Sequence, residues 1–237
     1  MTDRPQADRP ARLPLIALLL AALALTAVIA VAAVRRSSDA QSVALTPANP
    51  GPFRGGVLPK GIDRAPAPDF RLRDASGGRV DTRELRGKPY ALTFLYVECP
   101  DVCPLIGQEI RAGLELLGSR ADEVAVVAVS VDPQGDTPEA VRAWLKRHRL
   151  PRNFHYLIGD ERELKPVWDA YYAAPQIPGR AQSAHTASIW LIDARGRWRT
   201  KFSAGAPVAP KDLAHDFRVL LQETDRRAAA ADAGSRG

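Results

Sequence analysis

Residues 90–104 read YALTFLYVECPDVCP and contain both cysteines of the chain, Cys99 and Cys103. Residues 90–97 are apolar, β-branched or aromatic, which is typical of a buried strand. After the cysteines, apolar residues recur at helical spacing, at Ile106, Ile110, Leu114 and Leu117. The stretch therefore predicts a strand, a turn that carries two thiols, and a helix with one core-facing side.

The spacing of the two cysteines brings both sulfurs within reach of one metal ion, or of each other as a disulfide. The N–H groups at a helix N-terminus are expected to favour thiolate over thiol. A purely stabilising disulfide is the weaker interpretation, because so short a loop gains little chain-entropy stabilisation. We therefore interpret Cys99 and Cys103 as a metal-binding or redox-active pair.

Further strands and helices alternate along the chain around this stretch. We expect a short hairpin near 70–80 and a helix at 104–118. Buried strands are expected at 124–131 and 154–158, with helices at 138–149 and 161–172. A hairpin at 186–202 and an amphipathic helix at 210–222 complete the domain. This order predicts an α/β, thioredoxin-like fold, in which a central mixed sheet carries helices on both faces.

The N-terminal region predicts a membrane anchor. Residues 13–34 are unbroken apolar sequence, bounded by Arg12 and by Arg35 and Arg36. As a helix they would span about 33 Å, the thickness of a bilayer core. We expect a cytoplasmic segment at 1–12, a single transmembrane helix at 13–34, a flexible tether at 35–65, the domain at 66–223 and a disordered tail at 224–237. The positive-inside rule then places the domain outside the cytoplasm, on the periplasmic side.

The formal net charge is +6, and much of the positive charge lies near the apolar stretch. No cluster of arginine or lysine interleaves with aromatic residues in the way that nucleic-acid binding requires. We therefore expect no nucleic-acid partner.

Three blocks resemble the SCO/SenC family: residues 96–104, 130–139 and 184–193, which read YVECPDVCP, SVDPQGDTPE and AHTASIWLID. The resemblance covers about residues 66–222. It implies a membrane-anchored, thioredoxin-like copper chaperone that assists assembly of the binuclear copper centre of cytochrome c oxidase. It also implies that Cys99, Cys103 and His185 bind copper, as Cu(I) and Cu(II), and that subunit II of the oxidase is a partner.

The chemistry of these residues agrees with that implication. Two thiolates and one imidazole form a soft ligand set suited to copper, although zinc stays open with three protein ligands. The other histidines, His148, His155 and His215, are each interpreted as structural or surface residues. Asp132 follows the strand at 124–131, where it either orients a ligand from behind or caps the next loop. Glu98, beside the first cysteine, is expected to raise the cysteine pKa values.

Two enzyme classes compete with the chaperone. An extracytoplasmic thiol–disulfide oxidoreductase would reduce the cysteines of a copper-protein partner, although such enzymes normally have two residues between their cysteines and this chain has three. A thiol peroxidase is the weakest alternative, because Cys99 lacks supporting hydroxyl and arginine residues. In an oxidising compartment either thiol role requires a dedicated reductase, and the chaperone also requires a copper donor. The sequence favours a metallochaperone but leaves open whether the chain is an enzyme.

Overall fold

The computed structural model of the chain describes residues 51–176, 188–203 and 208–235. Its seven strands form one sheet in the order β2-β1-β5-β4-β3-β6-β7. The strands are β1 (Arg71–Asp74), β2 (Arg79–Asp81), β3 (Tyr90–Leu95), β4 (Ala125–Ser130), β5 (Phe154–Ile158), β6 (Ser188–Ile192) and β7 (Trp198–Ser203). The α-helices are α2 (Val102–Glu115), α3 (Pro138–Arg147), α4 (Glu161–Tyr171) and α5 (Pro210–Gly234), with 3-10 helices η1 (Thr82–Leu85) and η2 (Gly118–Glu123).

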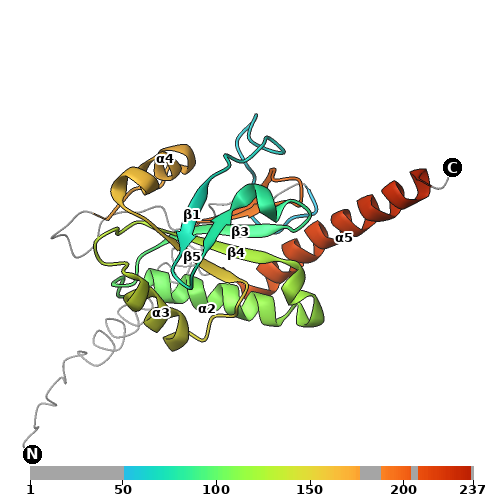
Figure 1. The fold of residues 1–237 in the computed structure, drawn as a ribbon. Helices are drawn as coiled ribbons and strands as arrows, with labels where there is room; N and C mark the ends of the chain where they lie inside the picture. The colour runs from blue at the N-terminus through green and yellow to red at the C-terminus, as the bar shows by residue number, and fades with distance from the viewer. Residues whose placement is uncertain (1–50, 177–187, 204–207, 236–237) are drawn as a thin grey trace, which may run out of the picture. The chain divides into compact units, whose positions relative to one another are not determined.

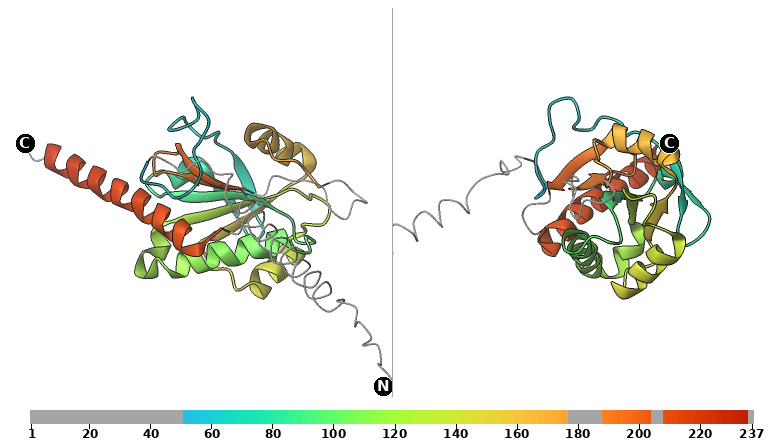
Figure 2. Two further views of the ribbon diagram at one scale, coloured as in Figure 1. Left: turned by 180° about the vertical axis from the view of Figure 1, so that it is seen from behind. Right: turned by 90° about the vertical axis from the view of Figure 1, so that its left-hand side faces the viewer.

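The sheet is mixed, as the sequence predicted. Strands β3, β4 and β5 run parallel, and every residue of β3 and β4 is buried. The hairpins β1–β2 and β6–β7 extend the sheet on either side by antiparallel pairing. Helices α2, α3 and α5 lie on one face and α4 on the other (Figures 1 and 2). Continuously apolar central strands need cover on both faces, and these helices provide it.

Helix α2 packs its apolar stripe on the sheet, with Ile106, Ile110 and Leu114 all buried. Gly113 allows Leu213 of α5 to approach closely, since a Cβ atom at this position would lie 3.0 Å from the Leu213 side chain. The helix begins at Val102, two residues earlier than predicted, because the Asp101 carboxylate accepts the Val102 N–H. Cys103 therefore lies in the first turn of α2.

The domain begins earlier in the chain than predicted. Residues 51–65 were expected to belong to a flexible tether, but Phe53 and Leu58 are buried in the core. The carboxylate of Asp216, on α5, accepts the backbone N–H groups of Arg54 and Gly55 at 2.8 and 2.9 Å. Residues 51–65 are therefore part of the domain and not of a flexible tether. Two apolar side chains and a buried carboxylate hold this proline- and glycine-rich segment in place.

The predicted boundary at the C-terminus is also wrong. Helix α5 does not end near 222 but continues to Gly234, although a disordered tail was expected from 224. Residues 228–231 are alanine, the best helix former, and no proline or glycine interrupts the helix before Gly234. This final part is exposed and extends away from the sheet (Figure 1).

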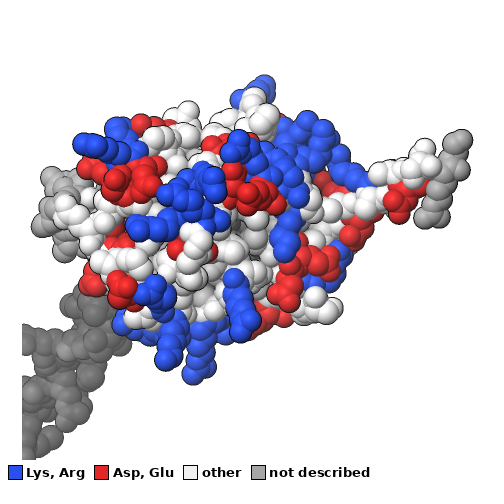
Figure 3. All heavy atoms as spheres, in the orientation of Figure 1, with Lys and Arg blue, Asp and Glu red and all other residues white. Residues whose placement is uncertain are grey.

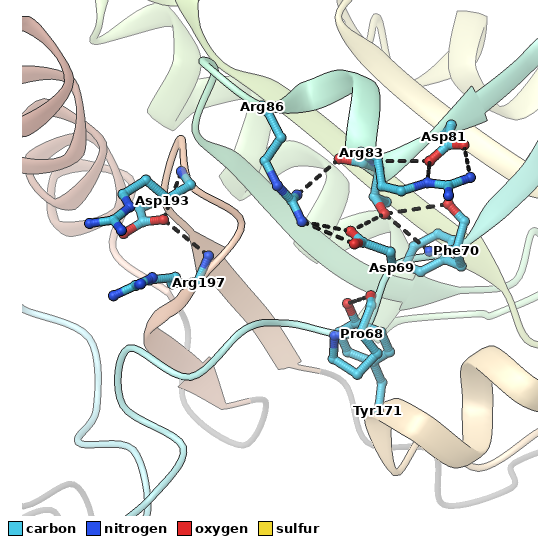
Figure 4. A network of polar contacts seen from close by, with 11 residues as sticks. Pro68, Asp69, Phe70, Asp81, Arg83, Arg86, Tyr171, Asp193 and Arg197 are labelled. Carbon is cyan, nitrogen blue, oxygen red and sulfur yellow. Dashed lines mark hydrogen bonds and ion pairs between the residues drawn. The ribbon is translucent and has the colours of Figure 1, made fainter. Parts of the chain in front are cut away.

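A network of polar contacts fixes the chain where it enters the sheet (Figure 4). Arg86 donates to both carboxylate oxygens of Asp69, at 2.9 and 3.0 Å. The hydroxyl of Tyr171, at the end of α4, donates to the Pro68 carbonyl at 2.7 Å. These bonds join the segment before β1 to the residue that follows η1 and to the end of α4.

The apolar stretch at 13–34 lies outside the described residues. Within the described part, no helix is both long enough and apolar enough to cross a bilayer.

Candidate metal centre

Cys99 and Cys103 lie where the sequence places them, on the turn between β3 and α2. The Cys99 N–H donates to the carbonyl of Tyr96 at 3.3 Å, which folds the chain back after the strand. Both cysteine side chains are buried, with exposed fractions of 5% for Cys99 and 0% for Cys103. The pair is therefore held under the surface at the carboxyl edge of the parallel strands, where α/β folds commonly place their sites.

The N-terminus of α2 is directed at one of the two sulfurs. The Cys103 N–H donates to Cys99 Sγ at 3.3 Å, an arrangement that suits a thiolate at Cys99. The pKa of the Cys103 thiol is raised well above its ordinary value, first by its hydrogen bond with Cys99 and then by burial. The expectation that the helix N-terminus favours thiolate therefore does not hold for Cys103, because its hydrogen bond with Cys99 and its burial both raise its pKa.

A buried carboxylate that the sequence analysis did not select lies behind the cysteine turn. Asp136 accepts the Val97 N–H at 2.8 Å, the Ser130 hydroxyl at 2.6 Å and the Tyr156 hydroxyl at 3.0 Å. Burial raises the pKa of Asp136 to about 6, and these three hydrogen bonds oppose the rise. The charge of Asp136 also contributes to the raised pKa of Cys103. Glu98, which the sequence analysis considered for this effect, is exposed.

Asp136 could have been recognised from its place in the sequence. It follows a buried strand and lies directly before the Thr137–Pro138 helix start. Asp132 follows the same buried strand, so the sequence position alone does not distinguish the two carboxylates. The structure distinguishes them, because the side chains of Tyr156 and Ser130 pack around the carboxylate of Asp136.

Asp132 has the geometry of a loop cap. Its Oδ1 atom accepts the N–H groups of Gln134 and Gly135 at 3.2 and 3.0 Å. These bonds match the capping alternative. The orienting alternative stays a prediction, since one of the three expected ligands, His185, lies outside the described residues.

His185 lies in residues 177–187, between the described residues Gln176 and Ser188. Both of these flanking residues lie at the edge of the sheet where the cysteine turn begins. The Gln176 N–H donates to the carbonyl of Val131, directly after β4, at 2.8 Å. The chain is described again from Ser188, the first residue of β6. Because β6 is antiparallel to β3, Ser188 lies toward the end of β3.

The remaining histidines have structural partners. His148 stacks on Trp144 with ring centroids 4.6 Å apart. His155 and His215 bond through Nδ1 to Asp74 and Asp216, at 2.8 and 3.0 Å. Across the described ranges, no three His, Cys, Asp or Glu side chains converge in a way that could hold a metal ion. The described part thus supplies two sulfur donors, which fit a soft metal ion such as copper.

The sequence model of the SCO1/SenC family matches residues 63–222, which include the cysteine turn and Asp136. The chain belongs to this family. Among solved structures, copper-bound ScoI of Bradyrhizobium japonicum is similar, with 33% identity and a TM-score of 0.57, over 66% of this chain and 99% of that one. BsSco, described with a disulfide switch, shares the fold at 20% identity and a TM-score of 0.57, over 66% of this chain and 94% of that one.

Curated relatives agree with this membership. A SCO2-like protein of Rickettsia conorii is 29% identical over 158 residues, which cover 63% of this SCO1/SenC chain and 74% of the relative. A putative copper-binding protein of Stutzerimonas stutzeri is 27% identical over 163 residues, which cover 67% and 76%. The thioredoxin-like Sco fold predicted from the order of the elements is confirmed.

Proposed function

We propose that this SCO1/SenC protein binds copper as cargo and assists assembly of the binuclear copper centre of cytochrome c oxidase. The observation that carries the proposal is the pair of sulfurs on one turn, with the Cys103 N–H directed at Cys99 Sγ. Copper prefers soft sulfur and imidazole donors, which Cys99, Cys103 and the proposed ligand His185 would provide. The copper-bound relative from Bradyrhizobium japonicum supports the same conclusion.

The proposed ligands are Cys99, Cys103 and His185. Support for His185 comes from the attachment of Gln176 and Ser188 at the edge of the sheet that precedes the cysteine turn. The other three histidines are engaged with Trp144, Asp74 and Asp216. Two thiolates suffice for Cu(I), whereas Cu(II) prefers the additional nitrogen donor.

The cellular setting is part of the proposal. Residues 13–34 anchor the chain as a single transmembrane helix, and the domain lies on the periplasmic side. Subunit II of the oxidase receives the copper, a separate donor supplies it, and an extracytoplasmic thiol reductase keeps the pair reduced. Family membership supports the assembly context.

Copper titration of the reduced full-length protein in neutral detergent tests the ligand set. Wild type should bind one copper ion, measured for Cu(I) by competition with a chromophoric chelator and for Cu(II) by its thiolate charge-transfer absorption. The Cys99→Ser, Cys103→Ser double variant should lose both signals. The matched control is His148→Gln, which removes an imidazole remote from the turn and should bind as wild type. Equal binding by the double variant would rule out the proposed site.

The same thiol pair supports a second function, reduction of a partner's disulfide. The observation in its favour is the hydrogen bond that links the two cysteines at the start of a helix, the usual location of exchange-active thiols. The balanced step joins Cys99 and Cys103 in a disulfide and transfers two electrons and two protons to the two partner cysteines. Exchange with an oxidised peptide from the subunit II copper loop should survive His185→Ala if this function is separate from copper binding.

A further inference from the structure

A hollow at the C-terminal end of α3 lies far from the cysteine turn and has no part in the proposed copper site. We call it the α3 pocket. Its volume is about 460 Å³, and its charged lining residues are Arg142, Lys146, Arg149 and Arg152. The pocket includes Phe154, which starts β5, whereas Cys99 follows the end of β3. Because these strands are parallel, the pocket and the cysteines lie at opposite edges of the sheet.

All charged residues that line the α3 pocket are positive. Arg142 is held in position by hydrogen bonds to the Ala75 carbonyl at 3.1 Å and to Glu139 at 2.7 Å. Within the described part of the chain, the other three cations form no ion pair. Figure 3 shows blue side chains gathered along the lower edge of the molecule, where Figure 1 places α3.

The side chains of these cations are not needed to cap the last carbonyl groups of α3. The N–H groups of His148, Arg149 and Leu150 already bond to carbonyls of the last turn, at 3.0, 3.1 and 3.0 Å. Arg149 has a φ of 53°, in the left-handed region that glycine or asparagine adopts more easily.

We propose that the α3 pocket binds the phosphate group of an organic phosphate. Guanidinium groups match phosphate oxygens in pairs, and the three cations without an ion pair among the described residues, Lys146, Arg149 and Arg152, can neutralise a doubly charged group. The apolar wall of Leu145, Leu150 and Phe154 suits the organic part that carries the phosphate. Anionic phospholipid head groups and soluble phosphate esters share this chemistry. With the proposed anchor in place, a membrane would present such head groups at high effective concentration.

Two probes distinguish these sources on the full-length protein in neutral detergent. Glycerol 3-phosphate, titrated by calorimetry, tests the soluble phosphate ester. Micelles doped with phosphatidylglycerol test the lipid head group, and micelles doped with phosphatidylcholine are the comparison. The measurement is amide hydrogen exchange in residues 142–154. Saturable glycerol phosphate binding, or protection specific to phosphatidylglycerol, supports the proposal. Absence of both overturns it.

A pair of glycine variants shows whether the pocket itself is responsible. Arg149→Gly removes one cation and relieves the backbone strain, so the fold should be retained. It should weaken binding of the active probe about tenfold, the loss expected for one charge-assisted hydrogen bond. The control is Arg64→Gly, since Arg64 is also left-handed, with a φ of 61°, and lies outside the pocket. Equal weakening by both variants would show a diffuse charge effect and refute the site. Copper binding should be unchanged in both, which separates this result from the proposed function.

Discussion

Replacement of Asp136 by asparagine should change how the stability of the protein depends on pH. The Asp136 carboxyl is buried, and its pKa is raised from its ordinary value of 3.8 to about 6, chiefly by burial. The folded state thus favours the protonated carboxyl over the charged one. Asparagine has nearly the same shape, can accept the Val97 N–H and carries no charge at any pH.

The sign and size of the effect follow from this difference. A raised folded-state pKa gives stability that is fully present below the unfolded-state pKa and is lost as the pH rises through the folded-state pKa. One pKa unit corresponds to about 1.4 kcal/mol, so the wild type should lose about 3 kcal/mol at Asp136 between about pH 3 and pH 7. The asparagine variant has no such loss, and its stability relative to wild type should therefore rise by about 3 kcal/mol across the same interval.

Urea unfolding of both proteins at several pH values measures this difference, because other titrating groups are common to both and cancel. Glu98→Gln is the matched control, since it removes an exposed carboxylate beside the same turn. This variant shows how much of any effect comes from removing a surface carboxylate beside the turn. Parallel pH curves for wild type and Asp136→Asn would refute the conclusion that burial dominates the environment of Asp136.

Three further predictions concern the copper site and the last helix. His185→Ala should weaken Cu(II) binding far more than Cu(I) binding, because two thiolates alone can hold Cu(I); equal losses in parallel titrations would contradict the ligand set. Oxidation should release copper in parallel with the loss of the two thiols. Bound copper and free thiols are counted in buffers of stepped redox potential. Copper that stays bound after both thiols have disappeared would exclude Cys99 and Cys103 as ligands. Truncation after Thr224 removes exposed helix and the 3.0 Å ion pair between Asp225 and Arg120, so unfolding free energy should fall by less than about 1 kcal/mol; a larger loss would reveal packing by the exposed turns.

Much of the fold could be predicted because its signals are local. The runs that become β3 and β4 are almost wholly apolar, as strands buried on both faces require. The start of α3 was equally clear, with Thr137 as its N-cap and Pro138 in its first turn. The errors lie at the domain boundaries. Residues 51–65 have the composition of a linker, and only contacts with distant residues such as Asp216 order them.

The candidate site divides in the same way. The sequence by itself determined the two cysteines, their position between a strand and a helix, and the family, because these depend on spacing and order along the chain. Only the tertiary structure decided that the Cys103 N–H serves Cys99 and that Asp136 lies behind the turn. The Asp136 carboxylate accepts hydrogen bonds from Val97 and Tyr156, which lie 39 and 20 residues away in sequence, and no local pattern encodes such contacts.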